Sequence, residues 1–181
     1  MKRTFNMWAL AALVTVLFTS CIKQIDKNYQ GPAVIEFDAA VLNSATTPFS
    51  YHVAVRTPPF GLPIATANSV PINRSLATPV RLRVNLVGAQ RTTDEVISFR
   101  VLTDVTPASP NMLAVAGTHY TITGNTFTIP AGSSFGEIAI NIVNPGTASS
   151  NPREVHLELV GNDRIKPSEN HKRVGIRIAQ N

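Results

Sequence analysis

Five segments from residue 80 onward alternate apolar and polar residues with a period of two. In VRLRVNLV, residues 80–87, positions 80, 82, 84 and 86 hold valine or leucine, and positions 81, 83 and 85 hold arginine or asparagine. Because successive strand side chains point to opposite faces, this pattern is typical of a strand with one buried face. The other four segments are VISFRV (96–101), EIAINIV (137–143), EVHLELV (154–160) and RVGIRIA (173–179). No segment shows a convincing 3.6-residue stripe, so the sequence predicts an all-β fold.

Turn-forming residues separate the predicted strands. The chain contains thirteen prolines, which argue against long helices because proline lacks the N–H that a helix interior requires. Proline, glycine and asparagine lie between the alternating segments, as in 107–110, 144–146 and 162–163. AVIEFDAAVL (33–42) and YHVAVRT (51–57) are further expected strands. Together these segments predict a β-sandwich of about seven to nine strands.

The stretch AGTHYTITGNTFTIPAGSSFGEIAINIV, residues 116–143, contains two short strands, HYTIT and TFTIP. Gly124-Asn125 between them accepts the positive φ values of a tight hairpin turn. Pro130 then removes a ladder hydrogen-bond donor, and Gly132 permits a bend. The sequence therefore predicts a hairpin, a corner and another strand.

This stretch, followed by EVHLELV, resembles the Calx-beta type of immunoglobulin-like sandwich, whose repeats run Gly-x-Asp-Tyr, strand, Ala-Gly corner, long alternating strand and Glu-rich strand. It also resembles small lipoproteins of Bacteroidota that carry such a domain, often beside outer-membrane glycan-uptake machinery. The resemblance covers about residues 78–181, and its motifs are mostly structural. It implies an immunoglobulin-like β-sandwich and says little about activity.

Calx-beta domains can bind Ca²⁺ through several carboxylates at one end of the sandwich. In this chain His119 replaces the family's aspartate in the Asp-Tyr pair. Ca²⁺ takes six to eight oxygen ligands, which acids scattered along the sequence do not readily supply. The acids of this part of the chain are scattered in that way: Asp94, Glu95, Asp104, Asp163 and Glu169. We therefore expect no bound metal and no cofactor.

The N-terminus has the layout of a secretory signal peptide. Lys2 and Arg3 precede a 12-residue apolar run, Met7 to Phe18, which is shorter than the roughly 20 residues that span a bilayer. Thr19 and Ser20 lead into Cys21, the only cysteine, as in the lipobox of bacterial lipoproteins. A disulfide would lack a partner within the chain, and a catalytic thiol here would lack folded surroundings to lower its pKa. The resemblance implies that residues 1–20 are removed and that Cys21 carries fatty acids such as palmitate, which would hold the chain at a membrane.

The remaining chain divides into a tether and one domain. Residues 21–32 are polar and aperiodic after the cysteine and read as a tether, and residues 33–181 form the β-sandwich domain. Loss of Lys2 and Arg3 lowers the net charge from +5 to +3, with both signs scattered along the chain. This pattern lacks the clustered cations of a nucleic-acid-binding protein.

Sequence motifs for catalysis are missing. The chain has no Gly-x-Ser-x-Gly elbow and no glycine-rich phosphate loop. Its four histidines lie too far apart for the close spacing of a zinc site: His52, His119, His156 and His171. We therefore expect no enzyme activity and name no catalytic residue.

Charged residues alternate on two of the predicted strands. Glu154, His156 and Glu158 share one face of EVHLELV, and Arg173 and Arg177 share one face of the last strand. If these strands are antiparallel neighbours, the expected result is a set of exposed cross-strand pairs worth about 0.2–1 kcal/mol each. We prefer this structural interpretation to a charged ligand site.

The segment RTPPFGLPIATANSVP, residues 56–71, holds four prolines among sixteen residues. One interpretation is an irregular crossover between sheets that places Phe60 and Leu62 in the core. The other is an exposed loop, with Pro58, Pro59, Phe60 and Leu62 as a partner-binding surface whose rigid prolines lower the entropy lost on binding.

The expected function is that of a membrane-anchored, non-catalytic accessory module that binds an envelope protein partner. The alternative is a surface glycan-binding lipoprotein of a polysaccharide-uptake system, although the only tryptophan, Trp8, lies in the leader. We expect the outer membrane, because no Asp follows Cys21, and leave the periplasmic or cell-surface face open.

Overall fold

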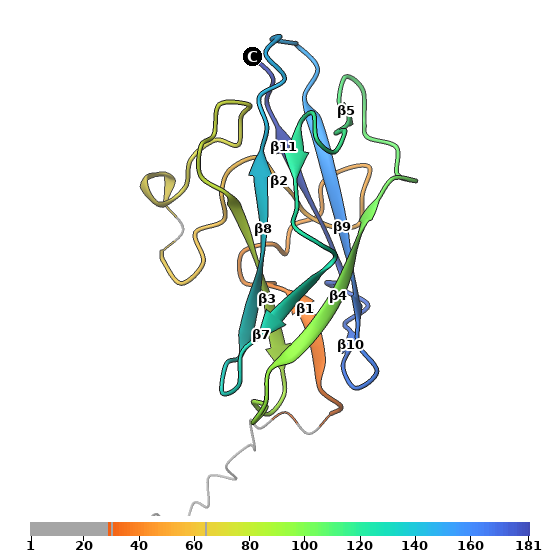
Figure 1. Cartoon of the computed structure of the whole chain (residues 1–181). Helices are drawn as coiled ribbons and strands as arrows, with labels where there is room; N and C mark the ends of the chain where they lie inside the picture. The colour runs from red at the N-terminus through yellow and green to blue at the C-terminus, as the bar shows by residue number, and fades with distance from the viewer. Residues whose placement is uncertain (1–28, 30, 64) are drawn as a thin grey trace, which may run out of the picture.

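The computed structural model describes residue 29 and residues 31–63 and 65–181, so that Cys21 and most of the expected tether lie outside the described residues. Eleven strands form two sheets that pack face to face (Figure 1). The strands are β1 (Val34–Phe37), β2 (Val53–Ala54), β3 (Val80–Val87), β4 (Glu95–Leu102), β5 (Met112–Leu113), β6 (Tyr120–Thr121), β7 (Thr126–Ile129), β8 (Phe135–Ile142), β9 (Arg153–Gly161), β10 (Lys166–Pro167) and β11 (Arg173–Ile178), and one 3₁₀ helix spans Thr66–Asn68. The predicted all-β sandwich is confirmed.

The strand order defines a five-stranded and a six-stranded sheet. The first runs β10-β1-β3-β8-β6, and the second runs β2-β11-β9-β4-β7 with β5 beside β9. The sequence predicted seven to nine strands, whereas the described residues form eleven. The difference comes from four strands of only two residues each, β2, β5, β6 and β10, which are too short to show a pattern in the sequence. The five alternating segments of the sequence became β3, β4, β8, β9 and β11.

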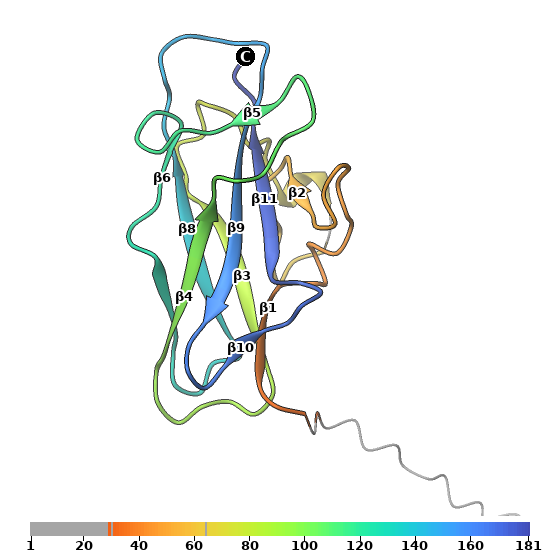
Figure 2. The same cartoon turned by 90° about the vertical axis from the view of Figure 1, so that its right-hand side faces the viewer.

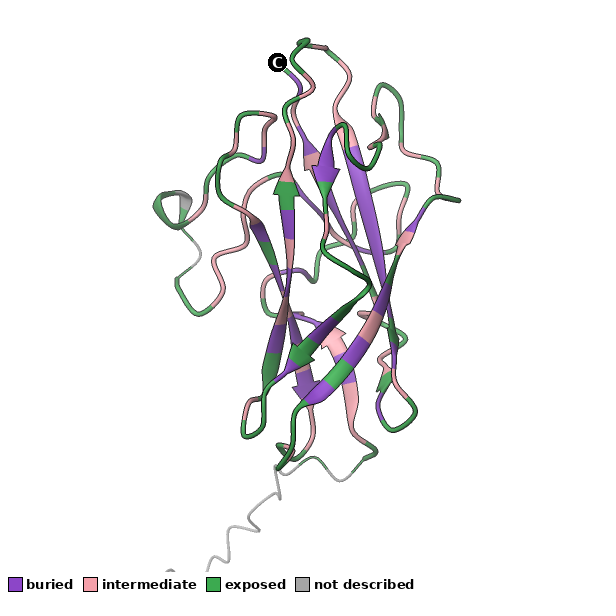
Figure 3. Cartoon of the chain, in the orientation of Figure 1, coloured by how far each residue is buried: buried purple, intermediate pink, exposed green. Residues whose placement is uncertain are grey.

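The core lies between the two sheets. Alternate side chains of β3, such as Leu82 and Val84, are fully buried, and they face Leu157 and Ile176 from the second sheet within one apolar cluster. Figure 3 shows this burial along the long strands and an unusually continuous buried stretch on β9. Burying a side chain of this size contributes about 1.5–3 kcal/mol, so the alternation seen in the sequence is also the main source of stability.

The predicted hairpin around Gly124-Asn125 is wrong. Tyr120 and Thr121 of β6 pair with β8 in the first sheet, whereas β7 pairs with β4 in the second. The connection between them crosses from one sheet to the other, and Gly124 takes a positive φ of 69° in that crossing. Tyr120 and Phe127 are both buried. Each therefore reaches the core from a different sheet, which a two-stranded hairpin would not allow.

The corner after β7 is present. Gly132 has a φ of 72°, and its N–H donates to the carbonyl oxygen of Arg91 at 2.8 Å. The chain then enters β8 in the opposite sheet. The corner therefore carries the chain from one sheet to the other.

The two expected strands near the start of the domain are much shorter than predicted. β1 ends at Phe37 because Asp38 begins a turn, accepting the N–H groups of Val41 and Leu42 on its carbonyl oxygen. The segment 51–57 forms only β2, which pairs in parallel with β11. The chain between β1 and β3 therefore runs mostly as irregular loops along the side of β11 (Figure 2).

Candidate functional site

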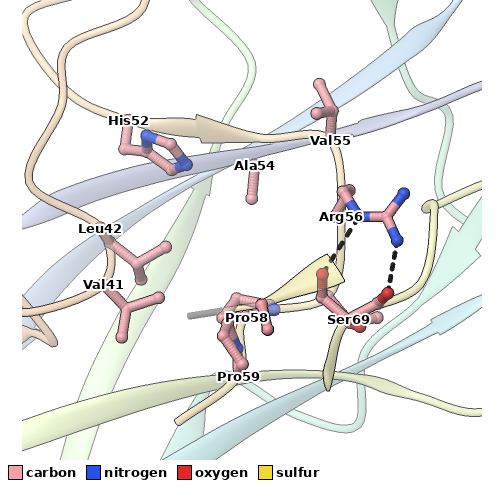
Figure 4. Close-up of a pocket in the computed structure, with 11 residues that line it drawn as sticks. Val41, Leu42, His52, Ala54, Val55, Arg56, Pro58, Pro59 and Ser69 are labelled. Atoms are coloured by element: carbon pink, nitrogen blue, oxygen red, sulfur yellow. Dashed lines mark hydrogen bonds between the residues drawn. The ribbon is translucent and has the colours of Figure 1, made fainter. Parts of the chain in front are cut away.

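A pocket of about 340 Å³ lies beside β2, where the irregular segment between β1 and β3 folds back on itself (Figure 4). Six residues supply most of its apolar wall: Val41, Leu42, Ala54, Val55, Pro58 and Pro59. Polar groups come from His52, Arg56, Thr57 and Ser69. A concave, mostly apolar site with a few polar groups is the usual form of a binding site.

Hydrogen bonds across the two arms of the loop hold the pocket open. The guanidinium Nε of Arg56 donates to the Ser69 hydroxyl at 3.0 Å, and a second nitrogen donates to the Ser69 carbonyl. Thr57 and Val70 exchange two further bonds, from the Thr57 N–H to the Val70 carbonyl and from the Val70 N–H to the Thr57 hydroxyl. The pocket wall is therefore tied to the loop backbone and does not depend on packing alone.

The four predicted partner-binding residues differ in their surroundings. Pro58 and Pro59 line the pocket. Phe60 is half-buried, packs against the core and lies 5.2 Å from the Arg83 guanidinium. Leu62 is 58% exposed and is not in the core. The segment connects β2 of one sheet with β3 of the other, so it is an irregular crossover that also carries exposed apolar groups.

Sequence reasoning missed the other half of the pocket. Val41 and Leu42 were expected in a strand, and His52 was expected to occupy a strand face or a loop without a role. Their positions depend on the turn at Asp38 and on the pairing of β2 with β11. The available local signal was Arg56 directly before Thr57-Pro58-Pro59, a charged residue beside rigid apolar ones.

The charged residues of β9 lie in a second notable region, on the outer face of the six-stranded sheet. The predicted register is present: Arg173 lies opposite Glu158, and Arg177 lies opposite Glu154. The predicted exposure is wrong, because Glu154, His156 and Glu158 are all buried. The reason is a cover of loop residues: the Phe49 ring lies 4.6 Å from the His156 ring, and the Tyr51 hydroxyl lies 3.1 Å from His156 Nδ1.

One continuous hydrogen-bonded series runs from Tyr51 through His156 and Glu154 to Arg177. His156 Nε2 lies 3.0 Å from a Glu154 oxygen, which can only accept, so Nε2 donates; in a neutral imidazole Nδ1 then accepts the Tyr51 O–H. Arg177 Nε donates to the other Glu154 oxygen at 2.7 Å. Every member therefore has a partner, which a buried polar group requires.

Two opposing effects set the carboxyl pKa values in this region. Burial acts to raise the pKa of Glu154, but hydrogen bonds from His156 and Arg177 outweigh it and hold that pKa below its usual value. For Glu158, burial is likewise outweighed by hydrogen bonds from Arg100 and Arg173, so its pKa is also lowered. Both carboxylates stay ionised at neutral pH.

A hydroxyl, an imidazole and a carboxylate in series is the arrangement that activates nucleophiles in hydrolases. Here burial, opposed by the charge of Arg173, raises the pKa of Tyr51 to about 12, and the Tyr51 side chain is only 8% exposed. Because the hydroxyl is buried and hydrogen-bonded to His156, we assign the series a structural role: it fixes the loop around Tyr51 against β9.

Replacing Tyr51 with phenylalanine should flatten the alkaline limb of the stability curve. A tyrosine in the unfolded chain has a pKa of 10.0, whereas burial raises the pKa of Tyr51 in the folded protein to about 12. The contribution of Tyr51 to the free energy of unfolding is therefore complete below pH 10 and is lost as the pH rises to 12. The wild type should lose up to about 1.4 kcal/mol per pH unit from this group in that range. Urea unfolding at pH 8–12 measures the slope, and Tyr29→Phe, at a 50% exposed site, is the control. Equal slopes for the wild type and Tyr51→Phe would contradict the assignment.

Aromatic side chains on the other sheet surround Arg83. Its guanidinium lies 4.1 Å from the centre of the Phe135 ring, and Phe135 is 39% exposed. The same guanidinium also contacts the half-buried Phe60. Glu137 lies 3.8 Å from Arg83 and 3.4 Å from Arg81. This outer face therefore combines an aromatic ring with cationic and anionic groups, which can also suit a polar ligand.

The acidic residues singled out in the sequence lie in separate surroundings. Within residues 31–63 and 65–181, no three histidine, aspartate or glutamate side chains gather as a metal site would require. Glu95 instead accepts from Arg164 at 3.0 Å and from Asn162 at 3.1 Å. In the same part of the chain, no helix has the length and apolarity needed to span a membrane.

Comparison with known proteins gives similarity of fold only. No protein family and no curated protein matches the sequence. Among solved structures, the apo form of the Calx CBD1 domain has a TM-score of 0.47 at 13% identity, over 61% of this chain and 88% of the other. A protein from Bacteroides ovatus described as a "putative carbohydrate binding protein" has a TM-score of 0.42 at 9% identity, over 59% of this chain and 32% of the other.

Proposed function

We propose that this chain is a membrane-anchored, non-catalytic β-sandwich lipoprotein that acts as an accessory protein-interaction module in a bacterial envelope. The observation that carries the proposal is the apolar pocket behind Pro58 and Pro59. Exposed apolar side chains occur on the same segment, with Val55 51%, Leu62 58% and Val70 47% exposed. An apolar pocket with exposed apolar side chains on the same stretch of chain is typical of a protein-binding surface.

The shape of the pocket suits a partner side chain. Its walls are fixed in advance by the Arg56–Ser69 and Thr57–Val70 hydrogen bonds and by two prolines. A preorganised site spends little conformational entropy when it binds. A partner that fills it with one large apolar side chain would gain about 1.5–3 kcal/mol from burial alone.

Glycan binding in a polysaccharide-uptake system is the alternative function. The observation that favours it is the exposed Phe135 ring with Arg83 against it, because sugar rings stack on aromatic faces beside polar groups. The site on that face is built from Phe60, Arg83 and Phe135, so a glycan should depend on Phe135 and not on the pocket. A glycan screen of the wild type against Phe135→Ala would separate this function from the first.

Site-specific photocrosslinking in intact envelopes tests the interaction module. A benzophenone amino acid at Val55, on the pocket wall, should yield a discrete protein adduct, whereas the same group at Val160, which is 49% exposed on β9, should not. Filling the pocket with Ala65→Phe should lower the adduct yield about tenfold or more, since the partner loses its burial energy.

The matched control for the filling variant is Ala108→Phe, at an exposed alanine in a different loop. It adds the same ring without touching the pocket and should leave the adduct unchanged. Equal adducts from Val55 and Val160, or an adduct that Ala65→Phe leaves intact, would contradict the proposed function.

A further inference from the structure

We propose that the pocket receives an aromatic side chain with a hydrogen-bond donor, a tryptophan or tyrosine of the protein partner, and that the Nε2 atom of His52 accepts that donor. This inference rests on the proposed function and specifies the chemistry of the partner. Three features of the pocket support it: the state of His52, the nature of the walls and the position of Arg56.

The hydrogen bonds of His52 fix which ring nitrogen carries the proton. Nδ1 lies 2.9 Å from the carbonyl oxygen of Ser44 and 3.1 Å from the hydroxyl of the same residue. A carbonyl oxygen can only accept, so Nδ1 must donate. In a neutral imidazole the other nitrogen, Nε2, is then an acceptor with a lone pair.

Nε2 has no partner for its lone pair within the part of the chain that the structure describes. His52 lines the pocket next to Ala54 and across from Pro58 and Pro59 (Figure 4). It thus offers an acceptor beside the apolar side chains of Leu42, Ala54 and the two prolines. A ligand that fills the pocket with an apolar body and brings no donor would leave that acceptor desolvated, which is unfavourable.

The remaining walls suit an aromatic ring. Val41, Leu42 and the two prolines present flat or branched apolar surfaces, and the guanidinium of Arg56 is held at the edge of the pocket by Ser69. A guanidinium beside an aromatic face gives a favourable cation–π contact. Tryptophan and tyrosine combine such a ring with one N–H or O–H, and both are enriched at interface hot spots.

The volume is consistent with one such side chain. About 340 Å³ is at the low end of the range for ligand pockets, roughly 300–1,000 Å³. It suits the anchor residue of a protein better than a large free ligand. Val55, which lines the pocket and is 51% exposed, can contact the partner beside the anchor.

Two probes that differ only in the donor test the inference. N-acetyl-tryptophanamide has an indole N–H, and its benzothienylalanine analogue has a sulfur in its place. The chain as isolated from its producing cells, in lipid nanodiscs, would be titrated with each probe while the methyl NMR signals of Val41, Leu42 and Val55 are followed. We expect the indole probe to bind about three- to tenfold more tightly, the range of one neutral hydrogen bond.

Variants at His52 assign this preference to one atom. His52→Leu should abolish the preference for indole while the sulfur analogue still binds, which shows that the pocket persists. His52→Gln, whose amide oxygen can accept, should restore part of the preference. His171→Leu, at a half-buried histidine of another loop, is the matched control and should change neither affinity.

Equal affinities of the wild type for the two probes, or binding of neither, would overturn the inference. The proposed function would survive that result if the Val55 crosslink still forms and Ala65→Phe still reduces it. Loss of the crosslink would instead remove the proposed function itself. Preservation of the indole preference in His52→Leu would show that another group accepts the donor and would also overturn the assignment.

Discussion

Replacing Glu154 with alanine should destabilise the domain by about 1–3 kcal/mol, the cost of leaving a buried donor, here the His156 N–H, without its acceptor. Its side chain is fully buried and accepts from both His156 and Arg177, at 3.0 and 2.7 Å. The substitution leaves the His156 N–H and part of the Arg177 guanidinium without an acceptor. Because Tyr51 hydrogen-bonds to the same imidazole, its loop should loosen as well. Urea unfolding at pH 7 measures the free-energy change.

Glu137→Ala is the matched control for this prediction. Glu137 also faces two arginines from a neighbouring strand, Arg81 and Arg83, but at 3.4 and 3.8 Å and with 28% of its side chain exposed. Water can solvate these groups after truncation, so the expected cost is about 0–1 kcal/mol. Equal costs at the two glutamates would contradict the claim that burial distinguishes them.

The same carboxyl predicts how stability falls in acid. The pKa of Glu154 lies below its usual value because the hydrogen bonds from His156 and Arg177 outweigh burial. A lowered pKa means that the contribution is present above the unfolded value of 4.5 and is lost as the pH falls through the folded value. The wild type should therefore lose stability below about pH 4.5 more steeply than Glu154→Ala.

The long strands were predictable because their signal is local. In β3, each step of the alternation is decided by whether a side chain points into the core, as with Leu82 and Val84, or out of it, as with Arg81. The same holds for β4, β8 and β11. These strands could be predicted without knowing their neighbours. Whatever element packs on the apolar face, the strand must alternate apolar and polar residues.

The burial of His156 was not predictable in this way. The alternation correctly indicates that Glu154, His156 and Glu158 point away from the core, and an outer sheet face is normally solvated. What covers it is Phe49 and Tyr51, from a segment about one hundred positions earlier in the chain. No periodic pattern relates the two segments. The available hint was a pair of aromatic residues in a stretch that forms no long strand.

The pocket shows the same division. Pro58 and Pro59 were noticed because prolines in a row exclude a central strand. The opposite wall, with Val41, Leu42 and His52, is assembled by the turn at Asp38 and the short parallel pairing of β2 with β11. A two-residue strand has too few positions to show periodicity. The sequence therefore indicated one wall of the site and not the pocket itself.

Replacing Cys21 with serine should abolish membrane association of the mature chain. A lipid on this residue requires the thiol, and each buried methylene of the acyl chains contributes about 0.8 kcal/mol to anchoring. Loss of two or more acyl chains removes the anchor from the chain that has lost its leader. Carbonate-washed membrane fractions and incorporation of labelled palmitate measure the change. Because Cys21 is the only cysteine in the chain, a palmitate label that depends on a cysteine must be attached at this residue.

Ser20→Ala is the control that separates the thiol from the leader. It keeps a small residue before Cys21 and should retain both the label and the membrane fraction. If the wild type carries no label, or if Cys21→Ser stays in the washed membranes, the chain is held by something other than a lipid on Cys21. The pocket chemistry would be unaffected by that result, since all its described walls lie between Val41 and Ser69. The partner of the module would then have to be sought without the restriction to a membrane face.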